Sequence, residues 1–146
     1  IEAVGGRILV VEGDMHNNFS LFERLKNDAK SLGNYSIDML ACVPPTLVSH
    51  ILDKTFSLPG HDMTRNGQKV WDATSAEIRD QYPHDRDALR IVQYDSCRGL
   101  EGWTVINYAF DDFWDYKYQQ GLEVKLEPDS PIQNANENAL KHASNW

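Results

Sequence analysis

One short segment of the chain combines residue types that bind phosphates and sugars. Between the apolar ends of the run Val92 to Val105 lies the sequence Arg98-Gly99-Leu100-Glu101-Gly102. The glycines let the backbone turn tightly and approach a ligand closely. Backbone N–H groups and a guanidinium suit a phosphate, and an ionised Glu101 accepts hydrogen bonds from ribose hydroxyls. The segment predicts a loop that contacts a nucleotide.

A simpler interpretation of the same residues stays open. Gly99 and Gly102 could serve only to make the turn, with Arg98 and Glu101 pairing at the surface. A short loop with glycines is a weak motif by itself, so the loop's position in the fold has to decide between the two interpretations.

The elements around the loop are expected to place it at the edge of a sheet. Apolar runs predict strands at 7–12, 36–43, 88–94 and 104–110. Helical spacing and capping signals predict helices at 19–34, 44–52, 74–82, 111–118 and 139–146, with a loop or irregular hairpin at 59–73 and a polar loop at 127–138. The alternation favours a parallel sheet covered on both faces. Loops at the carboxyl ends of such strands are where α/β folds bind ligands.

The run YDSCRGLEGWTVI, residues 94–106, resembles motif V of superfamily-1 DNA helicases of the UvrD-like type. In that motif a strand runs into Ser-x-(Lys/Arg)-Gly-Leu-Glu, a bulky aromatic residue and another apolar strand. The matching residues are Ser96, Arg98, Gly99, Leu100, Glu101 and Trp103, with Gly102 as one extra residue. The resemblance implies a three-layer α/β fold of the RecA-like (P-loop NTPase-like) type, with a mostly parallel sheet, as a single domain over residues 1–146.

The resemblance also implies roles for individual residues. Arg98, Gly99 and Glu101 match positions on the nucleotide side of the motif, near the phosphates and ribose of ATP bound between two RecA-like domains. Tyr94 and Ser96 match positions that lie toward the DNA strand. We therefore expect a second motor domain of an ATP-dependent DNA helicase or translocase, which acts on single-stranded or duplex DNA.

The sequence also departs from the family pattern. Gln93 and Asp95 replace the Thr and His often found there, and a carboxylate beside a phosphate backbone is unfavourable, so we expect no DNA contact from Asp95. The chain has no G-x-x-x-x-G-K-[ST] phosphate loop, no recognisable Asp-Glu pair for magnesium and no motif VI Arg, which would follow Trp146. We expect a fragment that does not hydrolyse ATP alone. Its ATP and Mg²⁺ would be held mainly by an N-terminal RecA-like domain.

Composition limits the partners and the location. Acidic residues outnumber basic ones by 22 to 14, so the chain alone should bind nucleic acid weakly. No stretch approaches the roughly 20 apolar residues that cross a bilayer, and the N-terminus lacks the layout of a signal peptide. Cys42 and Cys97 lie beside apolar runs, which favours reduced thiols. These features indicate one cytoplasmic domain.

Other residues with chemical potential are weaker candidates. The pairs His61-Asp62 and His84-Asp85 each resemble half of a metal site, but no second ligand pair stands at a suitable spacing, so we expect no metal. The aromatic residues of 110–118 could stack on bases. Their helical spacing and the interleaved aspartates favour a core face instead.

Two other classes of protein fit the sequence. A non-enzymatic α/β nucleotide-binding or receiver-like interaction module would use the glycine loop only as a turn. It is disfavoured by the lack of a clear acidic pocket after the first strand and of a Lys after the last. A small hydrolase would instead use Asp111, Asp112 or a histidine.

Overall fold

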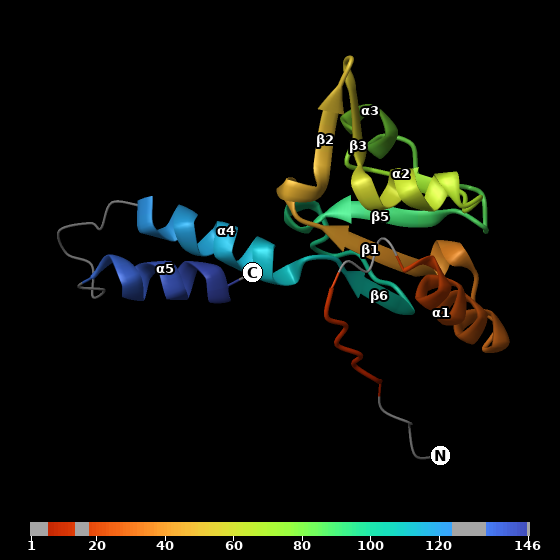
Figure 1. The fold of residues 1–146 in the computed structure, drawn as a ribbon, viewed down its shortest axis with the longest axis horizontal. Helices are drawn as coiled ribbons and strands as arrows, with labels where there is room; N and C mark the ends of the chain where they lie inside the picture. The colour runs from red at the N-terminus through yellow and green to blue at the C-terminus, as the bar shows by residue number, and fades with distance from the viewer. Residues whose placement is uncertain (1–5, 14–17, 124–133, 146) are drawn as a thin grey trace.

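The fold is built on a parallel sheet of four strands in the order β4-β5-β1-β6, flanked by helices (Figure 1). The computed structural model describes residues 6–13, 18–123 and 134–145. The strands are β4 (Val70–Asp72), β5 (Leu89–Gln93), β1 (Met39–Val43) and β6 (Thr104–Asn107). Ala41 of β1 lies opposite Ile91 on one side and Ile106 on the other, which fixes the register. The predicted α/β class and parallel sheet are confirmed.

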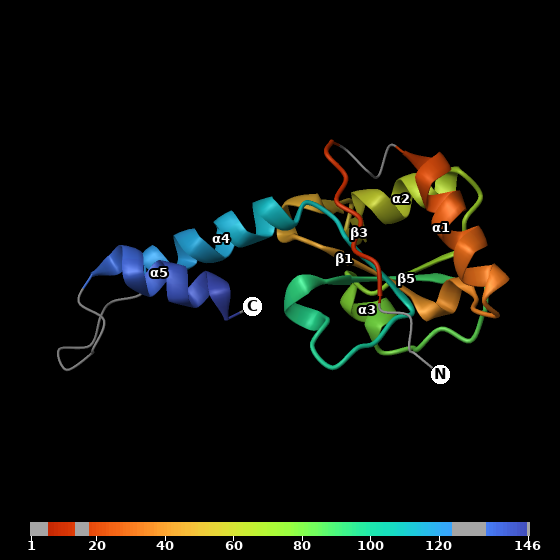
Figure 2. The ribbon, with the colours of Figure 1, turned by 90° about the horizontal axis from the view of Figure 1, so that it is seen from below.

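Alternating residues of the inner strands build a core on each face of the sheet. On the first face, Phe22 of α1 (Phe19–Ser31) and Met63 of α2 (Leu58–Arg65) are buried. They pack with strand residues Met39, Ala41, Val43, Leu89 and Ile91. The second face carries Leu40, Cys42, Ala73, Val92, Tyr94 and Phe113. Figure 2 shows α1 and α2 together on one side of the sheet, with the short helix α3 (Ala76–Arg79) on the other.

The helix expected at 44–52 is wrong. Only one turn of 3-10 helix forms, at Pro45–Leu47, and an antiparallel hairpin follows, made of β2 (Val48–Ile51) and β3 (Lys54–Ser57). The turn residues Leu52 and Asp53 both have positive φ, 49° and 62°, as a two-residue hairpin turn requires. The prediction missed this because Leu-Asp lacks the usual glycine signal and the proline pair suggested a helix start.

The loop expected at 59–73 is also wrong. Ser57 caps α2 by accepting a hydrogen bond from the N–H of Gly60, at 3.0 Å, and Pro59 occupies the first turn. A proline at that place costs no hydrogen bond and has the right φ, so Pro59-Gly60 begins a helix here and does not make a turn. The edge strand β4 forms in the same region.

The run 7–12, expected to be the first strand, contains no strand. Its apolar side chains are largely exposed, and the segment runs beside β6 without pairing with it. By contrast, the strands expected at 88–94 and 104–110 and the helix at 19–34 are confirmed, with boundaries shifted by a few residues. Met39 begins the strand expected at 36–43, because residues 36–38 form a 3-10 turn.

A pair of helices projects from the sheet at its carboxyl edge. α4 (Phe110–Glu123) and α5 (Ala135–Ser144) lie side by side in both views (Figures 1 and 2). They cross closely at Gly121, where an added Cβ would lie 2.6 Å from the Cα of Ala139. The expected helices at 111–118 and 139–146 are thus confirmed and begin earlier. The polar loop expected at 127–138 is wrong over residues 135–138, which are helical, while residues 124–133 and 146 lie outside the described part. None of the described helices has the length and apolar character needed to cross a membrane.

Asp72 joins the end of β4 to two other segments. One carboxylate oxygen accepts hydrogen bonds from the N–H and the hydroxyl of Ser57, at 2.7 and 2.8 Å. The other accepts from the N–H and the hydroxyl of Thr74, at 3.1 and 2.5 Å. Ser57 is fully buried. The carboxylate therefore holds the hairpin, α2 and the chain before α3 at one corner of the sheet.

The substitution Asp72→Asn should lower the free energy of unfolding by about 1–3 kcal/mol, because one end of the amide turns a donor toward other donors. Asp53→Asn, at an exposed turn position, should change it by less than about 0.5 kcal/mol. Urea unfolding of both variants measures the difference. Equal stability of the two variants would show that the Asp72 network contributes nothing.

Candidate functional site

The loop singled out in the sequence leaves the carboxyl end of β5, one of the two inner strands of the sheet. A turn of 3-10 helix at Tyr94–Ser96 follows the strand, and the N–H of Leu100 donates to the carbonyl of Cys97 at 3.0 Å. Gly99 has φ +78° and no atom within 4 Å of an added Cβ. A glycine is favoured here by its φ, and the space above it is open.

The far end of the loop reaches the amino end of β1. An added Cβ at Gly102 would lie 2.9 Å from the Cβ of Leu40 and 3.3 Å from the carbonyl of Asp38. The N–H of Trp103 donates to that carbonyl at 2.7 Å. The loop therefore crosses the second face of the sheet from the carboxyl ends of the strands to their amino ends (Figure 2). Gly102, the residue extra to the motif, is what permits this close approach.

Arg90 holds the middle of this crossing. Arg90 is 6% exposed, and its Nη2 donates to the carbonyl of Glu101 at 2.6 Å. Nη1 reaches the hydroxyl of Tyr82 at 3.5 Å, whereas Nε is buried and has no hydrogen-bond partner among the described residues. A hydrogen bond from a charged guanidinium is stronger than one between neutral groups. The bond from Arg90 thus fixes the backbone at Glu101, while Glu101 itself is exposed to solvent.

The predicted nucleotide and DNA residues occupy different environments. Arg98, Gly99 and Glu101 are exposed, and Ser96 is half-buried. Tyr94 is 7% exposed, its hydroxyl donates to the carbonyl of Tyr108 at 3.0 Å, and its ring stacks on Phe113 with centroids 4.3 Å apart. Burial raises the pKa of the Tyr94 hydroxyl. In this conformation Tyr94 packs inside the second core.

Asp95 forms an ion pair with a buried lysine of α4. The ammonium of Lys117 lies 2.8 Å from the Asp95 carboxylate, and the two side chains are 5% and 39% exposed. Lys117 also donates to Gln120 at 3.2 Å and lies 5.5 Å from the ring centres of Phe113 and Tyr116. The acidic residue that departs from the family pattern therefore binds α4 to the turn after β5.

The two cysteines meet beside this turn. Cys42 at the end of β1 is buried, and Cys97 is half-buried and donates to the carbonyl of Tyr94 at 3.1 Å. Burial raises the pKa of the Cys42 thiol to about 12, and the neighbouring Cys97 adds to the shift. A thiol with so high a pKa stays protonated, and therefore unreactive, at neutral pH.

Two hollows of the described surface lie away from the loop. One of about 720 Å³ runs along β6, and one of about 380 Å³ lies near Lys26 and Lys30. Residues 98–102 line neither. Among the described residues, no three His, Cys, Asp or Glu side chains are grouped to hold a metal ion; Nδ1 of His61 lies 3.6 Å from the Asp62 carboxylate.

Sequence reasoning missed Arg90 and Lys117. Both stand in apolar patterns, Arg90 within a buried strand and Lys117 within an aromatic helix. A charged residue inside an apolar run was the available signal, because a charge is rarely buried without a partner. Trp71 donates its indole N–H to the carbonyl of Gln81 at 2.6 Å, whereas Trp103 is 61% exposed.

Comparisons with protein-family profiles, with curated proteins and with solved structures found no match for this chain.

Removal of either partner of the Asp95–Lys117 pair should have unequal effects. Asp95→Asn leaves a buried ammonium beside a neutral amide and should lower the free energy of unfolding by about 1–3 kcal/mol. Lys117→Met should cost less, because the remaining carboxylate is partly exposed and regains water. Urea unfolding of both single variants and the double variant tests the order. A greater loss for Lys117→Met would contradict it.

Thiol titration should distinguish the two cysteines. At pH 8 the folded protein should react at one thiol, Cys97, because the raised pKa keeps Cys42 protonated well above that pH. The count should rise to two in denaturant. Cys97→Ser should show no rapid reaction when folded, whereas rapid reaction at both thiols of the native protein would refute the assignment.

Proposed function

We propose that this chain is the second, RecA-like motor domain of an ATP-dependent DNA helicase or translocase. The observation that carries the proposal is the loop after β5. Arg98, Gly99 and Glu101 are exposed along it, and Arg90 fixes its backbone by a bond of 2.6 Å. The loop begins at the carboxyl end of an inner parallel strand, the edge at which α/β folds bind ligands, and Glu101 lies further along it, near the amino end of β1. Burial of the charged Arg90 side chain costs free energy, so we infer that its hydrogen bond to the loop carbonyl has a structural purpose.

The loop residues suit ATP by their chemistry. Arg98 and the open backbone at Gly99 offer donors to phosphate oxygens, and the exposed Glu101 carboxylate accepts from ribose hydroxyls. An ion pair between Arg98 and Glu101 at the surface stays the alternative interpretation of the same residues. ATP supplies the phosphoryl group whose hydrolysis drives closure and reopening of the two domains.

An exposed apolar surface beside the loop suits a first motor domain. Trp103 is 61% exposed, Tyr82 56% and Leu100 39%, all on or next to the segment that crosses the second face. We assign these exposed apolar side chains to the interface with the first domain. In the proposed assembly the first domain contributes the phosphate loop and the Mg²⁺ ligands, and its surface covers these side chains when it closes on ATP.

The DNA side of the proposal rests on fewer residues. Ser96 is half-buried at the carboxyl edge of the sheet, and we assign it a contact with the DNA strand. Tyr94 contributes by supporting the turn, through its stacking on Phe113 and its bond to Tyr108. Asp95 contacts Lys117 and is thereby kept from the DNA. Closure of the two domains would move this turn, and with it the grip on the strand.

Glu101→Gln tests the nucleotide role in the longer protein that carries this chain. Loss of a charged acceptor should lower DNA-stimulated ATP hydrolysis by about tenfold or more, since hydrogen bonds to charged groups contribute about 1.5–3 kcal/mol. Glu77→Gln, at an exposed position of α3, is the matched control and should leave hydrolysis unchanged. Unfolding midpoints should stay equal in both variants. Unaltered kinetics for Glu101→Gln would reject the role.

A further inference from the structure

The strand β6 has one open edge. It pairs with β1 on one side, and within the described residues no strand pairs with its other side. The N–H of Tyr108 donates to the carbonyl of Cys42 at 2.9 Å. Because backbone groups alternate in direction along a strand, the N–H groups of Val105 and Asn107 point away from β1. The strand carries no charge and no proline, the usual protections of an exposed edge.

An apolar segment lies beside this edge. In 7–12 the exposed fractions alternate: Ile8 95%, Leu9 64%, Val10 85% and Val11 37%. Side chains that alternate between two faces are the pattern of a strand, even though the backbone of the segment is unpaired. Four consecutive exposed apolar residues are unfavourable in water, since each would gain by burial.

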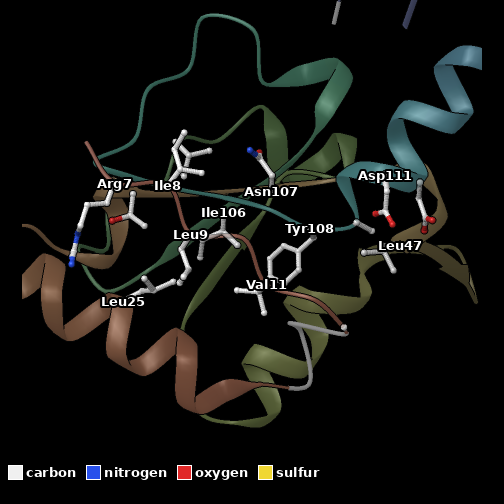
Figure 3. Close-up of a pocket in the computed structure, with 15 residues that line it drawn as sticks. Arg7, Ile8, Leu9, Val11, Leu25, Leu47, Ile106, Asn107, Tyr108 and Asp111 are labelled. Atoms are coloured by element: carbon white, nitrogen blue, oxygen red, sulfur yellow. The ribbon is translucent and has the colours of Figure 1, made fainter. Parts of the chain in front are cut away.

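The hollow of about 720 Å³ separates the segment from β6. Leu9 and Val11 line it from one side and Ile106 and Tyr108 from the other, with Leu25 of α1 at its floor (Figure 3). In Figure 3 the labels from Arg7 to Val11 run in the same direction as those from Ile106 to Tyr108. The segment thus lies parallel to the strand and on its open side.

We propose that the open edge of β6 binds the segment Arg7–Glu12 as a fifth parallel strand. Leu9 and Val11 then fill the hollow against Leu25 and Ile106 and extend the first core. Ile8 and Val10 cover Val105, which is 50% exposed on the opposite face. α1 becomes the crossover helix between two parallel strands of one sheet.

The segment of the same chain is the occupant favoured over a second copy or a foreign peptide. It is tethered to α1, and a tethered segment competes at a high effective concentration. It also already lines the hollow that it would fill. This inference does not depend on the nucleotide role of the loop.

Amide hydrogen exchange of the whole chain tests the proposal. The N–H groups of Val105 and Asn107 should exchange about tenfold or more slowly than in an unpaired strand. Val10→Asp should abolish that protection, while Ala41 and Ile91 in the inner strands stay protected. Leu52→Asp, which replaces an equally exposed leucine in the hairpin turn, should have no effect. Val10→Thr supplies a milder variant if Val10→Asp unfolds the domain.

Three results would overturn the proposal. The first is rapid exchange of Val105 and Asn107 in the unaltered protein. The second is protection that persists in both Val10 variants. The third is protection that rises with protein concentration, which would assign the edge to a second copy of the chain.

Discussion

A parallel connection between β5 and β6 obliges the chain to travel back along the whole length of the sheet, and the hydrogen bond from Arg90 to Glu101 determines where it crosses. Arg90 is buried in the second face, where the low dielectric strengthens its hydrogen bond to the loop. Gly102 then lets the loop approach Leu40 and begin β6 in register with β1. The position of the edge strand and the exposure of Glu101 both follow from this crossing.

The two faces of the sheet are consequently unequal. Two helices, α1 and α2, cover the first face with a core that includes Phe22 and Met63. On the second face a four-residue helix, a 3-10 turn and the crossing loop replace long helices. That arrangement leaves Trp103 largely exposed. A face that is covered by a loop, and not by a long helix, can bind a second domain. This is the basis for the proposed assembly around ATP.

Asp95 joins the turn after β5 to the projecting helices. Its carboxylate binds the ammonium of Lys117 of α4. The ion pair fastens the α4–α5 projection to the turn that follows β5. Movement of the loop would therefore be transmitted to both helices.

Much of the fold could be predicted from periodicity, but pairing could not. The strands around the loop were predictable because MLACV and LRIVQ are apolar throughout, as strands buried on both faces are. The hairpin at 48–57 was missed because its turn uses Leu52 and Asp53 in place of glycine. The segment 7–12 has the alternation of a strand but is unpaired in the structure. Alternation alone could not predict this, because it does not encode which backbone a strand pairs with.

The candidate site was predictable only in part. Local spacing located Arg98, Gly99 and Glu101, since they are adjacent in sequence. Arg90 and Lys117 act through contacts across 11 and 22 residues of chain, to Glu101 and Asp95, that no local pattern encodes. Tyr94 matched the motif, but the aromatic ring of Phe113 holds it in the core.

The most direct test of the central claim is hydrogen exchange of the peptide 97–103 in a protein that joins this chain to the proposed first motor domain, with and without a non-hydrolysable ATP analogue and Mg²⁺. The account predicts slower exchange at Gly99 and Glu101 when the nucleotide binds, with no change in the hairpin at 48–57. Exchange in 97–103 that is the same in both states would contradict the claim that this loop contacts ATP.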